Sequence, residues 1–154
     1  MSQQLYQSSV IIVISIWLFA CSEPLPAEKQ IALVMEKMQA AADEKRLIDL
    51  MMPFHASFLG KQNMRKQDLQ GRIFFHFRIN PKVRVFVNNA EIQVDGEDAE
   101  VSCHLLVTGS QKQLPDRGRF YRVTSSWKKF DDEWMVVEAE WEDVVQDVIE
   151  ELAD

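Results

Sequence analysis

From Pro26 onward, hydrophobic residues recur at intervals of three and four positions. This spacing gathers them on one side of a helix and predicts an amphipathic helix that begins near Pro26. Its predicted buried face contains Ile31, Val34, Met35, Met38, Ala41 and Ala42. A second, shorter helix is predicted at Arg46–Met52, because Pro53 cannot continue it. A third is predicted from Asn63, a residue type that favours the N-cap, through Leu69, Ile73 and Phe77.

Between about Lys82 and Trp141 the period falls to two, which predicts four antiparallel β-strands. Turn-forming residues separate the strands at Asp95-Gly96, at Gln113 to Gly118 and at Asp131-Asp132. In the first strand the apolar residues change phase across Asn88-Asn89, which predicts a bulge or bend.

Each later strand has one mainly apolar side. These sides are Ala99, Val101, Cys103, Leu105 and Val107; Tyr121, Val123, Ser125 and Trp127; and Met135, Val137, Ala139 and Trp141. The alternate residues of these strands point to the other side of the sheet; most are polar, although Trp134 and Val136 are among them. On that side we expect cross-strand polar pairs among His104, Arg122, Glu138 and Glu140. The predicted sheet therefore has one buried and one solvated face.

Helices followed by such a sheet indicate an α+β fold rather than βαβ units. The elements occur in the order helix, helix, short extended piece, helix, and then long bent hairpins that end in a Trp-containing strand. This order resembles the nuclear transport factor 2-like superfamily, which includes the SnoaL-like proteins. The resemblance is carried by LIDLMMPFHASFLG (47–60), IQVDGEDAEV (92–101) and YRVTSSWKKFDDEWMVV (121–137). It implies a cone-shaped domain over residues 28–141, in which N-terminal helices pack on a curved antiparallel sheet around a pocket. It leaves function open, because this fold serves isomerases, dehydratases and binding subunits.

The N-terminal segment differs sharply in composition, since residues 1–22 contain no Asp, Glu, Lys or Arg. Val10–Ala20 is an apolar run of 11 residues, whereas a membrane-spanning helix needs about 20. The length is typical of the hydrophobic region of a secretory signal. The run closes with Leu18-Phe19-Ala20-Cys21, which resembles the lipobox of a bacterial lipoprotein precursor.

That resemblance implies a signal peptide at residues 1–20 and acylation of Cys21, with residues 21–27 as a lipidated tether. Two or three acyl chains hold a protein stably on a bilayer. Ser22, the residue after the lipidated cysteine, implies the outer rather than the inner membrane, with the domain facing the periplasm. The alternative is an ordinary secretory signal cut near Ala20, with Cys21 unmodified.

The composition is that of one globular domain, with 47% apolar and 27% charged residues. A net charge of −7 argues against a nucleic-acid partner. Residues 131–154 contain 11 acidic and no basic side chains, which leaves 17 basic against 13 acidic elsewhere. An acidic C-terminal helix at residues 142–154 is expected to dock through Val144, Val145, Val148, Ile149 and Leu152 and to neutralise the basic body. Alternatively, the basic residues face anionic lipid headgroups.

Little in the sequence points to catalysis or to metal binding. The apolar strand faces carry no Asp, Glu or His, so an acid/base enzyme would have to use Asp49 or His55 at the pocket mouth. No two of the three histidines have a metal-ligand spacing, and no Gly-rich phosphate loop occurs, so we expect neither a metal nor a cofactor. Cys103 is expected to be a small buried hydrophobe.

Aromatic residues supply the ligand-binding candidates, which are Tyr121, Trp127 and Trp141. The alternative is that these side chains simply fill the core. The sequence thus predicts a non-catalytic module that binds a small apolar or amphipathic ligand, or a partner protein. An isomerase- or dehydratase-like enzyme and a homodimeric assembly subunit that pairs through its open sheet face remain alternatives.

Overall fold

The computed structural model describes residues 24–110 and 117–144 of the 154-residue chain. The predicted signal peptide, Cys21, the interior of the 113–118 turn and most of the predicted C-terminal helix lie outside these ranges. The helices are α1 (Ala27–Asp43), α2 (Leu47–Met51), the short 3₁₀ helix η1 (Lys61–Asn63) and α3 (Lys66–Ile79). The strands are β1 (Phe54–Gly60), β2 (Met64–Arg65), β3 (Lys82–Asp95), β4 (Asp98–Ser110), β5 (Arg117–Phe130) and β6 (Glu133–Asp143).

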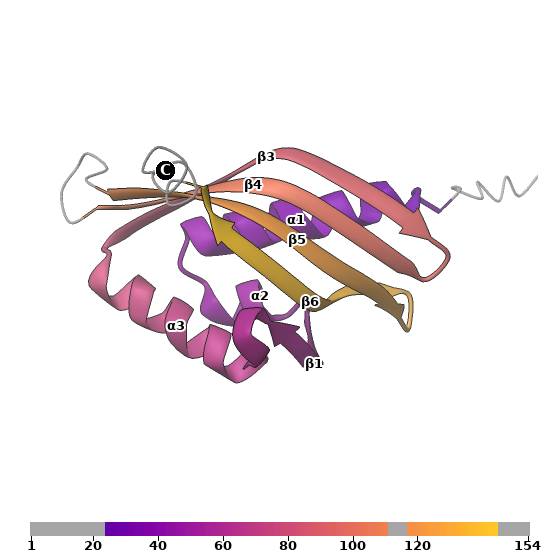
Figure 1. Ribbon diagram of the computed structural model, residues 1–154, viewed down its shortest axis with the longest axis horizontal. Coiled ribbons are helices and arrows are strands. Elements are labelled where there is room, and N and C mark those ends of the chain that lie inside the picture. The colour runs from indigo at the N-terminus through magenta and orange to yellow at the C-terminus, as the bar shows by residue number, and fades with distance from the viewer. Residues whose placement is uncertain (1–23, 111–116, 145–154) are drawn as a thin grey trace, which may run out of the picture.

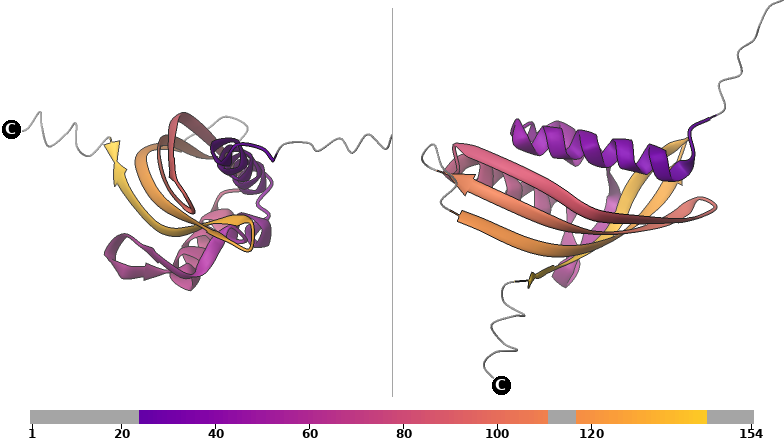
Figure 2. Two further views of the ribbon diagram at one scale, coloured as in Figure 1. Left: turned by 90° about the vertical axis from the view of Figure 1, so that its right-hand side faces the viewer. Right: turned by 90° about the horizontal axis from the view of Figure 1, so that it is seen from above.

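The strands form one curved sheet in the order β2-β1-β6-β5-β4-β3. All neighbours pair antiparallel except β1 and β6, which run parallel. The sheet wraps over α1, while α2 and α3 lie below its β6 side (Figures 1 and 2). The fold is therefore the predicted α+β cone, although its sheet is mixed and has six strands instead of four.

The predicted face of α1 is the buried one. Ile31 is fully buried, and Ala41 and Ala42 are also buried. Beyond the helix the chain turns at Lys45, whose φ of 57° is left-handed. The Asp43 carboxylate accepts a hydrogen bond of 2.8 Å from the backbone N–H of Val85, so the end of α1 is fixed to β3.

The short extended piece expected after the second helix is strand β1, in which Phe54, Phe58 and Gly60 are buried. One prediction about this region is wrong. Asn63 is not the cap of the third helix, because it has a left-handed φ of 59° inside η1. The cap is Arg65, whose backbone N–H donates to the Asp68 carboxylate at 3.0 Å.

The predicted bulge of the first strand is confirmed, because the β3–β4 register shifts between Asn88 and Glu91. The turns at Gly96 and at Asp131-Asp132 are confirmed as well, with φ values of 63°, 47° and 67°. These positive values suit the tight hairpins that join twisted strands.

A second bulge was not predicted. The β5–β6 register shifts between Ser126 and Trp127, so the side chains of β6 change phase near Val137. Trp134 and Val136 consequently lie in the core with Ala139, and their assignment to the solvated face is wrong.

The core lies between α1, β1 and the inner face of β4–β6. Its buried members are Ile31, Met51, Phe54, Phe58, Ala99, Val101, Trp127, Trp134, Val136 and Ala139. The Trp127 indole donates to the Ser125 hydroxyl at 3.0 Å, and that hydroxyl donates to the Val101 carbonyl at 3.3 Å. These bonds satisfy the indole nitrogen of Trp127 and the hydroxyl of Ser125, whereas the Trp134 indole nitrogen is buried without a partner among the described residues.

Candidate functional site

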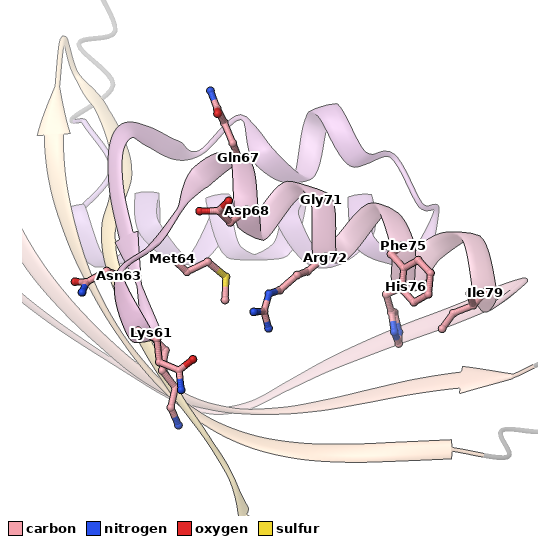
Figure 3. Close-up of a pocket in the computed structure, with 11 residues that line it drawn as sticks. Lys61, Asn63, Met64, Gln67, Asp68, Gly71, Arg72, Phe75, His76 and Ile79 are labelled. Atoms are coloured by element: carbon pink, nitrogen blue, oxygen red, sulfur yellow. The ribbon is translucent and has the colours of Figure 1, made fainter.

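A depression follows one side of α3 and the η1–β2 segment before it. We call it the α3 groove; its volume is about 920 Å³. It is lined by Lys61, Gln62, Asn63, Met64, Gln67, Asp68, Gly71, Arg72, Phe75, His76 and Ile79 (Figure 3). Met64, Arg72 and His76 project from this side toward the sheet (Figure 3).

Part of the groove is apolar and exposed. Phe75 is 64% exposed and Ile79 is 41% exposed, although both are large hydrophobic residues. Exposed apolar surface of this kind is typical of binding sites.

The charge in the α3 groove is mainly positive. Lys61 donates from Nζ to the Trp141 carbonyl at 3.0 Å and so links the groove to the end of β6. Arg72 has no hydrogen bond or ion pair with any described residue. Asp68 is the acidic residue in the lining of the groove, and its carboxylate accepts a hydrogen bond from the backbone N–H of Arg65. A cationic group beside an apolar surface can bind the acidic end of an amphipathic molecule.

His76 is the titratable group best suited to chemistry in the groove. Burial lowers the pKa of His76, and the positive charge of Arg119 on β5 lowers it further. The Asn80 amide nitrogen lies 3.3 Å from Nδ1, which makes Nδ1 the acceptor and leaves the proton of the neutral ring on Nε2. Nε2 is buried without a hydrogen-bond partner among the described residues.

Asn80 fixes the end of α3 against the sheet. It is 3% exposed, and its amide nitrogen donates to the His76 carbonyl at 3.0 Å. Lys45 donates to the Asn80 carbonyl at 3.1 Å. A Cβ placed on Gly109 of β4 would lie 2.5 Å from the Asn80 Oδ1, so only glycine allows this close approach.

The structure does not place the two predicted catalytic candidates in this groove. Asp49 is exposed on α2, forms an ion pair with Arg46, and lines a separate depression of about 660 Å³ between α2 and α3. His55 is on β1, where its Nδ1 lies 2.7 Å from the Ser57 hydroxyl and its ring stacks on Phe130 at 4.3 Å.

The three predicted ligand-binding aromatics also lie outside the lining of the α3 groove. Trp127 is 2% exposed and belongs to the core, as the alternative interpretation stated. The Trp141 ring covers Gly60, where an added Cβ would lie 3.0 Å from it. Tyr121 is half-buried and pairs in register with Leu105 and Asp143.

The functional candidates that the structure adds are Lys61, Arg72 and His76. Asp68, Arg72 and His76 follow one another at intervals of four, which places them on one face of α3 beside the predicted apolar stripe. That polar stripe was the available signal. Nothing in the sequence shows that the sheet curves toward this stripe.

Cys103 is buried, as expected, and burial raises the pKa of its thiol. Within residues 24–110 and 117–144, no three His, Cys, Asp or Glu side chains come together as metal ligands would. In the same ranges no helix has the length and hydropathy needed to cross a bilayer.

No family model matches the chain, and no curated protein matches it in sequence. Solved structures do match its fold. A protein from Novosphingobium aromaticivorans, named as a candidate scytalone dehydratase, superposes with a TM-score of 0.67 and 15% identity, covering 75% of this chain and 83% of that chain. A nuclear transport factor 2-like protein of unknown function from Pseudomonas putida gives a TM-score of 0.65 and 13% identity, covering 75% and 84%.

A third match is ActVI-ORFA from Streptomyces coelicolor, with a TM-score of 0.62 and 11% identity over 79% of this chain and 97% of that one. The fold is therefore nuclear transport factor 2-like, as the resemblance in the sequence implied.

Proposed function

We propose that this nuclear transport factor 2-like protein is a membrane-anchored periplasmic lipoprotein that binds a small amphipathic anion in the α3 groove and releases it unchanged. The observation that carries the proposal is the pairing of an unpartnered cation, Arg72, with the exposed apolar side chains of Phe75 and Ile79. The anchor rests on the lipobox-like Leu18-Phe19-Ala20-Cys21 and on the length of the apolar run before it.

The ligand chemistry follows from the lining. The acidic group would accept charge-assisted hydrogen bonds from Arg72 and Lys61, and its hydrocarbon part would cover Phe75 and Ile79. A volume of about 920 Å³ is within the range of small-molecule sites.

The position of the tether favours a ligand that is dissolved in the periplasm. Five residues separate Cys21 from Ala27, so the start of α1 would lie within about 20 Å of the lipid attachment. The end of α3 that carries Ile79 lies at the opposite end of the cone (Figure 1). The basic α3 face would thus be turned away from the bilayer, which argues against its binding lipid headgroups.

The test is a titration with a fluorescent fatty acid and with its neutral alcohol analogue. Arg72→Gln is expected to weaken binding of the acid by about tenfold to a hundredfold, the value of one charge-assisted hydrogen bond. Arg78→Gln is the matched control, because Arg78 is on the same helix but lies over Phe74, outside the groove. Equal affinity of both variants for the acid, or equal binding of acid and alcohol, would reject an anion site.

A dehydratase- or isomerase-like enzyme is the second candidate, and His76 favours it. Its lowered pKa favours the neutral ring, whose Nε2–H can donate a hydrogen bond to a substrate oxygen. Incubation with a panel of β-hydroxy carbonyl compounds, followed by mass spectrometry, would detect loss of water. Turnover that His76→Gln abolishes would support an enzyme, whereas unchanged compounds would support binding alone.

A homodimer is the third candidate. Phe86, Leu106 and Phe120 are register neighbours on β3, β4 and β5, on the sheet face opposite the core. Phe86 and Phe120 are 46% and 47% exposed, so they form an apolar strip. Sedimentation should show a dimer that the double variant Phe86→Lys, Phe120→Lys dissociates, and a monomer at high concentration would reject pairing.

A further inference from the structure

The chain leaves the sheet at the edge of the α3 groove. β6 ends at Asp143, and two residues earlier the Trp141 carbonyl accepts the hydrogen bond from Lys61, a lining residue of the groove. Val144, the last described residue, directly follows this strand end, and residues 145–154 come after it in the sequence. The separate depression between α2 and α3 contains no residue of this edge.

Residues 145–154 combine apolar and acidic side chains, the two kinds that would complement the lining of the α3 groove. The apolar positions Val145, Val148, Ile149 and Leu152 have helical spacing, and the acidic residues are Asp147, Glu150, Glu151 and Asp154. No Lys or Arg occurs among them. As a helix these ten residues would be about 15 Å long, against about 21 Å for the 14 residues of α3.

The groove supplies the complementary surface. Phe75 and Ile79 expose apolar area that no described residue covers, and covering large apolar side chains is favourable. Lys61 and Arg72 supply positive charge beside them. The entropic cost of docking is limited for a segment that directly follows Val144, because β6 ends beside the lining residue Lys61.

We infer that residues 145–154 form a helix that docks in the α3 groove of the same chain. Its apolar side packs on Phe75 and Ile79, and its acidic side chains lie near Lys61 and Arg72. The segment has the same chemistry as the ligand proposed above, so it competes with that ligand for the groove. This competition rests on the proposed function, whereas the docking does not.

Photocrosslinking in the full-length protein, purified from bacterial membranes in detergent, tests the docking. A benzophenone amino acid replaces Phe75 in one variant and Phe74 in the other; Phe74 is adjacent and 52% exposed but lines the separate depression. We expect peptide mapping to join position 75 to residues 145–154 several-fold more often than position 74. Equal yields, no tail product, or a product that joins two chains would overturn the inference.

Charge provides a second readout that does not depend on the photoreactive residue being tolerated. Hydrogen exchange of α3 is expected to become faster when Asp147→Asn, Glu150→Gln, Glu151→Gln and Asp154→Asn are combined, because the tail is then held less tightly. Unchanged exchange would count against docking. Fluorescent fatty acid should bind more tightly to a chain that ends at Val144; crosslinking without any fatty-acid binding would reject the proposed function and leave the docking intact.

Discussion

Replacement of Gly109 by alanine tests whether the contact between Asn80 and β4 positions the α3 groove. The new Cβ would lie 2.5 Å from Oδ1 and 2.9 Å from Cγ of Asn80, so the amide has to move. Asn80 is 3% exposed, and its side chain holds the His76 carbonyl, so movement strains a packed site. Overpacking costs about 1–3 kcal/mol and a weakened hydrogen bond about 1 kcal/mol.

We therefore expect Gly109→Ala to lower the free energy of unfolding by about 2–4 kcal/mol, measured by urea denaturation. Gly71→Ala is the matched control, because nothing lies within 4 Å of its added Cβ. Alanine is the better helix former, so this variant should gain up to about 1 kcal/mol. Fatty-acid affinity should fall in the first variant. Equal stability changes in the two variants would refute the idea that Asn80 anchors α3.

Three further predictions concern individual side chains. Trp127→Ala should destabilise the fold by about 3–5 kcal/mol in urea denaturation, because Trp127 is 2% exposed in the core, and a loss below about 1 kcal/mol would place it elsewhere. The pKa of His76 is lower in the folded state than its ordinary value of 6.5, so the unfolded chain binds more protons and stability should fall as pH drops through about 6.5. His76→Phe should flatten that dependence between pH 5 and 7, and an identical slope in both proteins would contradict it. Burial raises the pKa of the Cys103 thiol, so iodoacetamide should modify Cys103 in urea but not in the native protein; native labelling at the same rate would show it exposed.

The elements that could be predicted from the sequence are those with a regular local signal. Apolar spacing located α1, and turn residues located the hairpins at Gly96 and Asp131. The short extended piece at β1 was expected, but its place in the sheet could not be predicted, because its parallel partner β6 is about 80 residues away and their register shifts between Phe54 and Leu59. The bulge near Val137 was missed for a similar reason, since a register shift changes which face is buried without a local marker.

The candidate site was less predictable than the fold. Asp49 and His55 were chosen by residue type and position in the chain, yet Asp49 pairs with Arg46 and His55 stacks on Phe130. Arg72 and His76 matter because the curvature of the sheet leaves a groove along α3, and curvature depends on long-range pairing. The sequence could identify a polar helical stripe but not the surface that it faces.

Native mass spectrometry of the protein released from its host membranes tests the account most directly. The account predicts a chain that begins at Cys21 with a diacylglyceryl group and an acyl chain attached, carrying a small acidic ligand that the Arg72→Gln variant loses. A chain that still carries residues 1–20, has an unmodified Cys21 and holds no such ligand would contradict it.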